Sequence, residues 1–147
     1  ELLIELQALT TLPSTYTSEE FPFILSAGER RSFTANVIIR NPEWRRRDKH
    51  GALRISPGDA RTLHLADGDH VRIVTETGSA TTPIEISDMM QNGHISLPNG
   101  FGVSYPDKDG DTSVGVALNT LTTTTRRDHF SGSPWHKTVP ARIEKLA

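Results

Sequence analysis

The sequence contains no cysteine among its 147 residues. Disulfide bonds, iron–sulfur ligation, cysteine zinc sites and thiol catalysis are therefore excluded within it. A chain without cysteine fits the cytoplasm, where disulfides are rare, and we expect that location. No signal peptide is visible. No apolar stretch approaches the roughly 20 residues needed to cross a bilayer, so a membrane is not an expected partner.

An excess of basic charge is also missing. The 16 lysines and arginines are balanced by 18 acidic residues, which gives a formal net charge of −2. Proteins that bind nucleic acid or anionic membranes usually show a basic excess. We therefore do not expect nucleic acid as a partner. The length suits one domain with one hydrophobic core.

Motifs of metal and catalytic sites are absent or incomplete. None of the six histidines lies at a recognised ligand spacing. The acidic run 107–111 resembles the start of a calcium loop, but the required glycine and glutamate positions hold Thr112 and Leu118. We interpret this run as a solvated acidic turn. The sequence also has no glycine-rich phosphate loop between a strand and a helix, and no Gly-x-Ser-x-Gly elbow.

Short apolar and alternating segments predict a mainly β fold, a barrel or a sandwich. The predicted strands lie near 22–26, 52–55, 70–76, 80–87, 94–97 and 138–145. The first strand is expected to end at 26–28, where Gly28 permits a sharp turn. A short helix is predicted from Pro57 to about His64, with Ser56 as its cap. Residues 114–118 fit either a strand or a short buried segment.

The first twenty residues show a different sequence pattern from the predicted β segments. Residues 1–12 place leucines at helical spacing, and residues 13–20 read as a connector. The chain opens inside this helix-like run with a residue other than methionine. We therefore expect residues 1–20 to be a linker or the helix remnant of a preceding domain, and residues 21–147 to form the binding domain.

Two long irregular segments, 26–50 and 98–137, flank the predicted strands, and binding residues tend to lie on such loops. The basic run 45–47 beside Trp44 could contact a phosphate or nucleic acid, but we prefer to interpret it as a solvated charged loop. The pairs 30–31 and 126–127 are better candidates for an anion site, because the guanidinium fork of arginine suits phosphate recognition.

Four segments, taken in order, resemble the molybdopterin dinucleotide-binding domain of the dimethyl-sulfoxide-reductase superfamily. The branch they resemble most is formate-dehydrogenase-like or thiosulfate-reductase-like. The segments are FILSAGERRSFTAN at 23–36 with the following IRNP and WR, LRISPGDA at 53–60 with the following DGD, NGHISLPNGFG at 92–102, and NTLT at 119–122 with the following RD, Gly132 and PWHK. Many relatives have arginine directly after the glycine of the first segment, whereas this chain has Glu29.

The resemblance implies a six-stranded double-psi β-barrel with one or two short helices. It also implies a bis(molybdopterin guanine dinucleotide) cofactor that carries molybdenum or tungsten. The chain would be the C-terminal domain of a larger oxidoreductase, with the preceding domains as its partners. Those domains would hold the metal ligand and the iron–sulfur cysteines, so the isolated domain would bind cofactor without redox turnover.

The resemblance further implies a set of cofactor-binding residues, with no catalytic residue and no metal ligand among them. Glycines would let the backbone approach the cofactor, arginine and lysine would supply cations, and polar side chains would supply neutral donors and acceptors. The set is Gly28, Glu29, Arg30, Arg31, Ser32, Thr34, Asn36, Asn99, Gly100, Asn119 and Lys137. We expect 26–36, 99–102 and 119–137 to converge on one face of the barrel.

Two alternatives remain open from the sequence. The first is a non-redox binding module with the same barrel, such as a substrate-recognition domain of an ATPase, because one fold hosts several functions. The second is a small self-contained decarboxylase-like enzyme, for which the chain lacks a plausible catalytic constellation.

Overall fold

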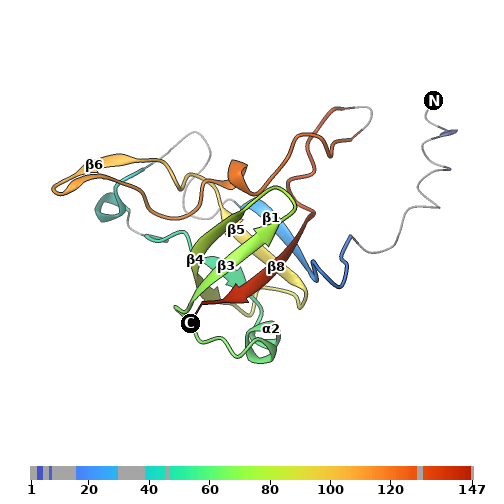
Figure 1. The fold of residues 1–147 in the computed structure, drawn as a ribbon, viewed down its shortest axis with the longest axis horizontal. Helices are drawn as coiled ribbons and strands as arrows, with labels where there is room; N and C mark the ends of the chain where they lie inside the picture. The colour runs from blue at the N-terminus through green and yellow to red at the C-terminus, as the bar shows by residue number, and fades with distance from the viewer. Residues whose placement is uncertain are drawn as a thin grey trace.

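Six strands of the chain close into a barrel in the order β1-β5-β2-β4-β3-β8 (Figure 1). The computed structural model describes residues 3, 4, 7, 16–29, 39–45, 47–128 and 131–146. The barrel strands are β1 (Phe23–Glu29), β2 (Leu53–Ile55), β3 (His70–Thr75), β4 (Ser79–Ile86), β5 (His94–Pro98) and β8 (Val139–Lys145). The predicted mainly β fold and its six barrel strands are therefore confirmed.

The strand directions give the barrel two different ends. The pairs β1–β5 and β2–β4 are parallel, and the other four neighbouring pairs are antiparallel. This mixture is consistent with the predicted double-psi barrel. It brings the last residues of β1, β3 and β5 to the same end as the first residues of β2, β4 and β8. We call this end the loop rim.

The short α-helix α2 (Pro57–Thr62) lies at the end opposite the loop rim (Figure 1). Ser56 caps it by accepting a hydrogen bond of 3.0 Å from the backbone N–H of Asp59. The helix ends slightly before the predicted His64, whose φ of 54° is left-handed. The sequence signals of cap and N-terminal proline therefore located this helix correctly.

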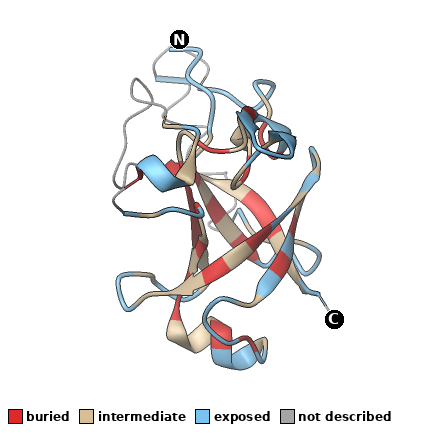
Figure 2. Cartoon of the chain, turned by 90° about the vertical axis from the view of Figure 1, so that its left-hand side faces the viewer, coloured by how far each residue is buried: buried red, intermediate tan, exposed pale blue. Residues whose placement is uncertain are grey.

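The core fills the inside of the barrel, and along several strands every second residue is buried. Along β3, Val71, Ile73 and Thr75 are buried, while His70 and Arg72 are exposed. Figure 2 shows the resulting buried bands along the strands. This period of two is the pattern from which the strands were predicted, because successive side chains of a strand point to opposite faces.

The first strand is longer than predicted. β1 continues through Gly28 to Glu29, and its pairing with β5 shifts register between Ala27 and Glu29. Gly28 has a φ of 84°, so the glycine makes a bulge inside the strand and not a turn that ends it. The prediction that the strand ends at 26–28 was therefore wrong, because the pairing with Pro98 extends it.

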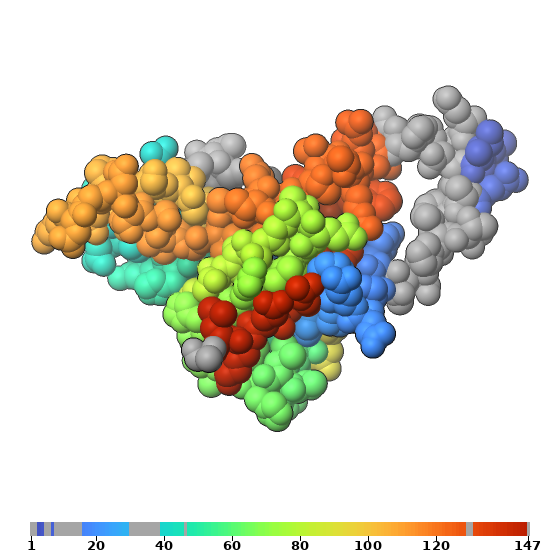
Figure 3. Space-filling view, in the orientation of Figure 1, coloured from blue at the N-terminus to red at the C-terminus, as the bar shows by residue number. Residues whose placement is uncertain are grey.

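Residues predicted as loop contain a second small sheet. β6 (Tyr105–Asp107) and β7 (Gly110–Thr112) form a hairpin that projects from the barrel, in orange at the left of Figure 3. The acidic run 107–111 is its exposed tip, as the solvated-turn interpretation requires. Residues 114–118 form no strand. Val116 within this segment is buried, which favours the alternative prediction of a short buried segment.

Two further 3₁₀ helices, η1 (Pro42–Trp44) and η2 (Leu118–Thr120), lie in the long connections. None of the helices in the described ranges has the length and hydropathy of a membrane span. The helix expected at 1–12 lies largely outside the described residues. Residues 16–20 do contact the domain, since Tyr16 packs edge-on against Trp135 and Glu20 pairs with Arg142 at 3.3 Å.

Candidate cofactor-binding site

The two longest connections of the chain and the β3–β4 turn start and end at the loop rim. The strand directions place 30–52, the β3–β4 turn at 76–78 and 99–138 there. Segments 26–29 and 99–102 and the described parts of 119–137 meet at this end, as their hydrogen bonds below show. The predicted convergence is confirmed for these segments. The predicted residues Arg30, Arg31, Ser32, Thr34 and Asn36 lie outside the described residues.

Three of the predicted residues meet around one carbonyl group. The carbonyl of Gly28 accepts hydrogen bonds from Asn99 Nδ2 at 2.8 Å and from Lys137 Nζ at 2.7 Å. Lys137 also donates to the Ala27 carbonyl at 2.9 Å, and the backbone N–H of Asn99 donates to the Glu29 carbonyl at 3.0 Å. These hydrogen bonds therefore fix the end of β1 to Asn99 and Lys137, which lie far from it in the sequence.

Gly28 is required at this meeting point for two reasons. Its φ of 84° is strained for residues with a side chain. A Cβ atom at this position would also lie 2.7 Å from Asn99 Oδ1, which is closer than real Cβ atoms come. Gly100 also has a positive φ, of 82°, but no atom of the described residues lies within 4 Å of a Cβ built there. Its Cα is therefore open to a ligand on that side.

Glu29, another predicted residue, points along the barrel wall. Its Oε1 accepts a hydrogen bond from Arg54 Nη1 at 3.1 Å, and its Oε2 accepts one from Ser96 Oγ at 2.5 Å. Arg54 Nε donates in turn to Glu85 Oε1 at 2.9 Å. These four residues belong to β1, β2, β5 and β4, so the network crosses four neighbouring strands of the barrel.

Arg45 is a site residue that the sequence reasoning missed. It is 2% exposed and donates from Nε to the Ile39 carbonyl at 2.5 Å and from Nη2 to the Gly100 carbonyl at 3.1 Å. Its guanidinium lies 3.8 Å from the ring centroid of Phe101. The interpretation of 45–47 as a solvated charged loop is therefore wrong for Arg45, although Arg47 is exposed.

Burial opposes the charge of this arginine but does not remove it. Desolvation lowers the pKa of the Arg45 guanidinium, and the nearby Asp48 and Tyr105 oppose the shift. Because arginine starts from so high a pKa, it keeps its charge at neutral pH. The sequence of a run of three arginines does not show which of them is buried. Arg45 is buried because Phe101 lies against it in the folded chain, and no pattern within the run indicates that contact.

Asn119 stands at the loop rim with its side chain available. It lies in η2, is exposed, and its amide makes no hydrogen bond within the described residues. η2 is held against the β3–β4 turn, because Thr75 Oγ1 donates to the Leu121 carbonyl at 2.9 Å. A Cβ atom on Gly78 would lie 2.5 Å from the Thr120 carbonyl oxygen, so the packing is close. The fold therefore presents a free amide on a fixed support.

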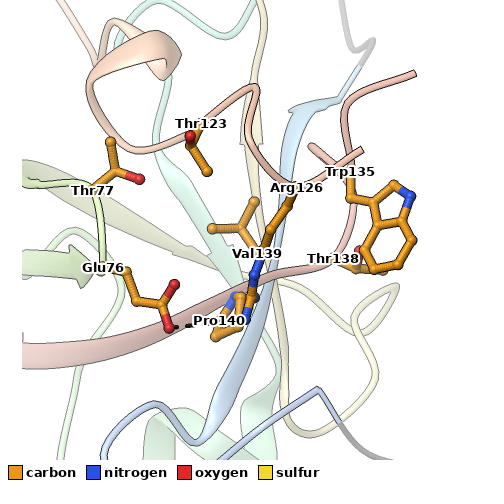
Figure 4. A pocket seen from close by; sticks show the side chains of 8 residues that line it. All are labelled: Glu76, Thr77, Thr123, Arg126, Trp135, Thr138, Val139 and Pro140. Carbon is orange, nitrogen blue, oxygen red and sulfur yellow. Dashed lines mark ion pairs between the residues drawn. The ribbon is translucent and has the colours of Figure 1, made fainter. Parts of the chain in front are cut away.

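A small recess lies beside η2, between the β3–β4 turn and the start of β8. Figure 4 shows the side chain of Arg126 turned toward Glu76, with a separation of 3.9 Å, while Trp135 forms part of the wall. The cavity volume of about 20 Å³ is close to that of one water, so a nucleobase does not fit. Arg126 is thus engaged with a carboxylate, and Arg127 pairs through its backbone with Pro134.

One buried polar atom near the meeting point has no partner. Nε2 of His136 is buried and makes no hydrogen bond within the described part of the chain. The carbonyl of His136 accepts a hydrogen bond of 2.8 Å from the backbone N–H of Ala27, so the residue adjoins β1. An unsatisfied buried polar group costs about 1–3 kcal/mol and commonly marks an absent ligand or water.

These features together fit a polar dinucleotide. The loop rim offers the open backbone of Gly100, the free amide of Asn119, the ammonium of Lys137 and the unpartnered nitrogen of His136. A dinucleotide carries many polar atoms that each need a partner. In the described residues, no group of three or more histidine, aspartate or glutamate side chains could hold a metal ion.

Comparison with known families decides the assignment. The family model described as "Molydopterin dinucleotide binding domain" matches residues 23–140, which includes five of the six barrel strands in whole and the first two residues of β8. The chain belongs to this family. The predicted resemblance is thereby confirmed, and the loop rim is the part of this molybdopterin dinucleotide-binding domain in which the predicted residues gather.

Individual relatives are larger proteins. The chain is 22% identical over 145 residues to the F420-dependent formate dehydrogenase subunit alpha of Methanocaldococcus jannaschii, covering 97% of this chain and 19% of that protein. It is 24% identical over 112 residues to a putative formate dehydrogenase of Staphylococcus aureus, covering 76% of this chain and 11% of that protein. The chain therefore spans no more than about a fifth of the length of either relative.

A further relative and a solved structure extend the comparison. An NADH-quinone oxidoreductase subunit of Salmonella typhimurium is 23% identical over 96 residues, which is 65% of this chain and 11% of that protein. The structure of acetylene hydratase from Pelobacter acetylenicus matches with a TM-score of 0.64 and 18% identity, over 87% of this chain and 19% of that chain. The structural match shows that the two share this fold.

Proposed function

We propose that this chain is the C-terminal domain of a larger molybdenum or tungsten oxidoreductase and binds the guanine dinucleotide end of its molybdopterin cofactor. The observation that carries the proposal is the family match over residues 23–140. The formate dehydrogenases among the relatives support an oxidoreductase, and the small share of each relative that the chain covers supports a larger parent. When bound, the cofactor supplies the redox chemistry, while the protein binds and orients it.

Within this proposal, the residues of the loop rim hold the cofactor. Gly100 lets the backbone approach it, and Asn119 offers its amide as donor and acceptor. Gly28 permits the close contact by which Asn99 and Lys137 are held at the end of β1. Lys137 places a positive charge beside the last residues of β1, which suits a diphosphate. The predicted residues of the following loop, Arg30, Arg31, Ser32, Thr34 and Asn36, would add further cations and polar groups. The unpartnered nitrogen of His136 adds a contact that the sequence reasoning did not assign.

Other features of the parent enzyme also stay predictions. The metal ligand and the iron–sulfur cysteines would lie in preceding domains, since this chain has no cysteine. Those domains would be the partners of this chain, and the parent would be cytoplasmic. The parent's reaction would be of the formate-dehydrogenase-like or thiosulfate-reductase-like class.

The test is a cofactor analysis of the polypeptide that carries residues 1–147. The protein is purified from cells supplied with molybdate and tungstate and then denatured. Guanine nucleotide is measured by chromatography, and metal is measured by mass spectrometry. We expect guanine nucleotide and either molybdenum or tungsten, at about two nucleotides per metal. Protein that folds and yields neither nucleotide nor metal would support a non-redox binding module in place of this function.

A second measurement concerns residues 1–147 alone. With artificial electron carriers, the isolated chain should not turn over formate, nitrate or thiosulfate. The sequence has no cysteine, and the described residues contain no group of three or more histidine, aspartate or glutamate side chains that could hold a metal ion. Turnover by the purified, metal-free chain would contradict the assignment of chemistry to the cofactor and the preceding domains.

A further inference from the structure

The side chain of Glu29 is held on the barrel wall although its backbone lies at the loop rim. Its two carboxylate oxygens accept hydrogen bonds from Arg54 and Ser96, at 3.1 and 2.5 Å. Ser96 is 4% exposed, and the side chains of Arg54 and Glu29 are 26% and 31% exposed. The carboxylate is therefore engaged by neighbouring strands, at a sequence position where the resembled family often has arginine.

We propose that Glu29 is a positioning residue: it fixes the end of β1, and with it the Gly28 carbonyl that Asn99 and Lys137 bind, without itself touching the cofactor. This inference rests on the proposed function of the loop rim. Glu29 is the last residue of β1 and directly follows Gly28. The orientation of Glu29 therefore sets where the Gly28 carbonyl, and the two side chains bound to it, lie.

Two sets of bonds hold this residue from different sides. On the barrel wall, Arg54 of β2 and Ser96 of β5 bind its carboxylate. At the rim, the Glu29 carbonyl accepts the backbone N–H of Asn99, and the preceding Gly28 carbonyl accepts Asn99 Nδ2 and Lys137 Nζ. Fixing a residue by both its side chain and its backbone removes rotational freedom that a single attachment would leave.

The same network explains why the role of Glu29 can be separated from folding. Arg54 also pairs with Glu85 at 2.9 Å, so it keeps a carboxylate partner when Glu29 is replaced. Partly exposed ion pairs contribute little to stability. Loss of Glu29 should therefore disturb the contacts of Gly28 with Asn99 and Lys137 more than it disturbs the barrel. Cofactor retention, measured beside thermal stability, distinguishes the two effects.

The experiment compares Glu29→Ala, Arg54→Met and the double variant in the full polypeptide. Guanine nucleotide is measured after gel filtration, together with the midpoint of thermal unfolding. We expect each single variant to retain less than about a third of the wild-type nucleotide and the double variant to retain no less than the single ones. Residues that act through one shared contact give effects that do not add.

Two more variants complete the comparison. Glu29→Gln should recover part of the nucleotide, because its amide oxygen can still accept one of the two hydrogen bonds. Glu144→Ala is the matched control, because its carboxylate pairs with Arg142 at 2.9 Å and with Arg72 at 3.8 Å near the opposite end of the barrel. It should retain the wild-type amount of nucleotide, whatever its effect on thermal stability.

The outcomes separate the two proposals. If the wild-type polypeptide holds nucleotide and Arg54→Met holds as much, while Glu29→Ala loses it, Glu29 touches the cofactor directly and the positioning role is wrong. If Glu29→Ala and Glu29→Gln both hold the wild-type amount, Glu29 has no role in binding. If the wild-type polypeptide itself holds none, the proposed function fails first, and the positioning role fails with it.

Discussion

Asn99 donates its side-chain amide to the carbonyl of Gly28 at 2.8 Å, across 71 residues of sequence. Asn99 follows β5 directly, and Gly28 is the bulge residue of β1. Because β1 and β5 are parallel neighbours, their last residues lie side by side. This one bond therefore ties the end of β1 to the first residue after β5.

Gly28→Ala should lower stability by about 2–4 kcal/mol. The new Cβ atom would meet Asn99 Oδ1 at 2.7 Å, and the left-handed backbone adds a strain of about 1–2 kcal/mol. Gly93→Ala is the matched control, because its φ of 77° is similar and no atom lies within 4 Å of its Cβ position. Denaturant unfolding should show about 1 kcal/mol for the control. Equal losses in the two variants would mean that the contact with Asn99 contributes nothing.

Arg45→Lys should destabilise the protein by about 1–3 kcal/mol, although it keeps the positive charge. Lysine has no planar fork with which to reach the Ile39 and Gly100 carbonyls together, and it loses the stacking on Phe101. Arg47→Lys, at an exposed position in the same run, should change stability by less than about 0.5 kcal/mol. A neutral result for Arg45→Lys in denaturant unfolding would contradict the structural role of Arg45.

Lys137→Met should reduce the guanine nucleotide retained by the full polypeptide severalfold. The ammonium lies at the end of β1, where it donates to the Gly28 and Ala27 carbonyls and places a positive charge at the loop rim. Lys145→Met is the control, since Lys145 also donates to a carbonyl, that of His64 at 2.6 Å, but near the opposite end of the barrel. Equal retention in the two variants would argue against a cofactor role for Lys137.

Asn119→Ala should lower cofactor retention severalfold while changing stability by less than about 0.5 kcal/mol. Its exposed amide makes no hydrogen bond within the described residues, so the fold loses little. Asn92→Ala should show the opposite result, with normal retention and a stability loss of about 1 kcal/mol, because Asn92 Oδ1 accepts the Ser56 hydroxyl at 2.6 Å. Normal nucleotide content in Asn119→Ala would remove Asn119 from the site.

The fold was largely predictable because its signals are local. Alternation in 70–76 and 80–87 reports one buried face, and the Ser56-Pro57 cap reports the start of α2. The strand predictions were wrong where pairing with a distant segment overrides the local conformational preference. Gly28 by itself permits a tight turn, but because β1 continues to pair with β5 beyond it, Gly28 forms a bulge within the strand. The β6–β7 hairpin carries few apolar residues, so alternation did not reveal it.

For the site, the sequence by itself determined the family, and with it the residue types expected to bind a dinucleotide. The ordered segments contain Gly28, Asn99 and Lys137, and these were predicted correctly as neighbours at one end of the barrel. Only the tertiary structure decided that Arg45 is buried against Phe101 and that Glu29 faces Arg54 along the barrel wall. Those pairings depend on strand order and register, which bring together residues that no local pattern relates.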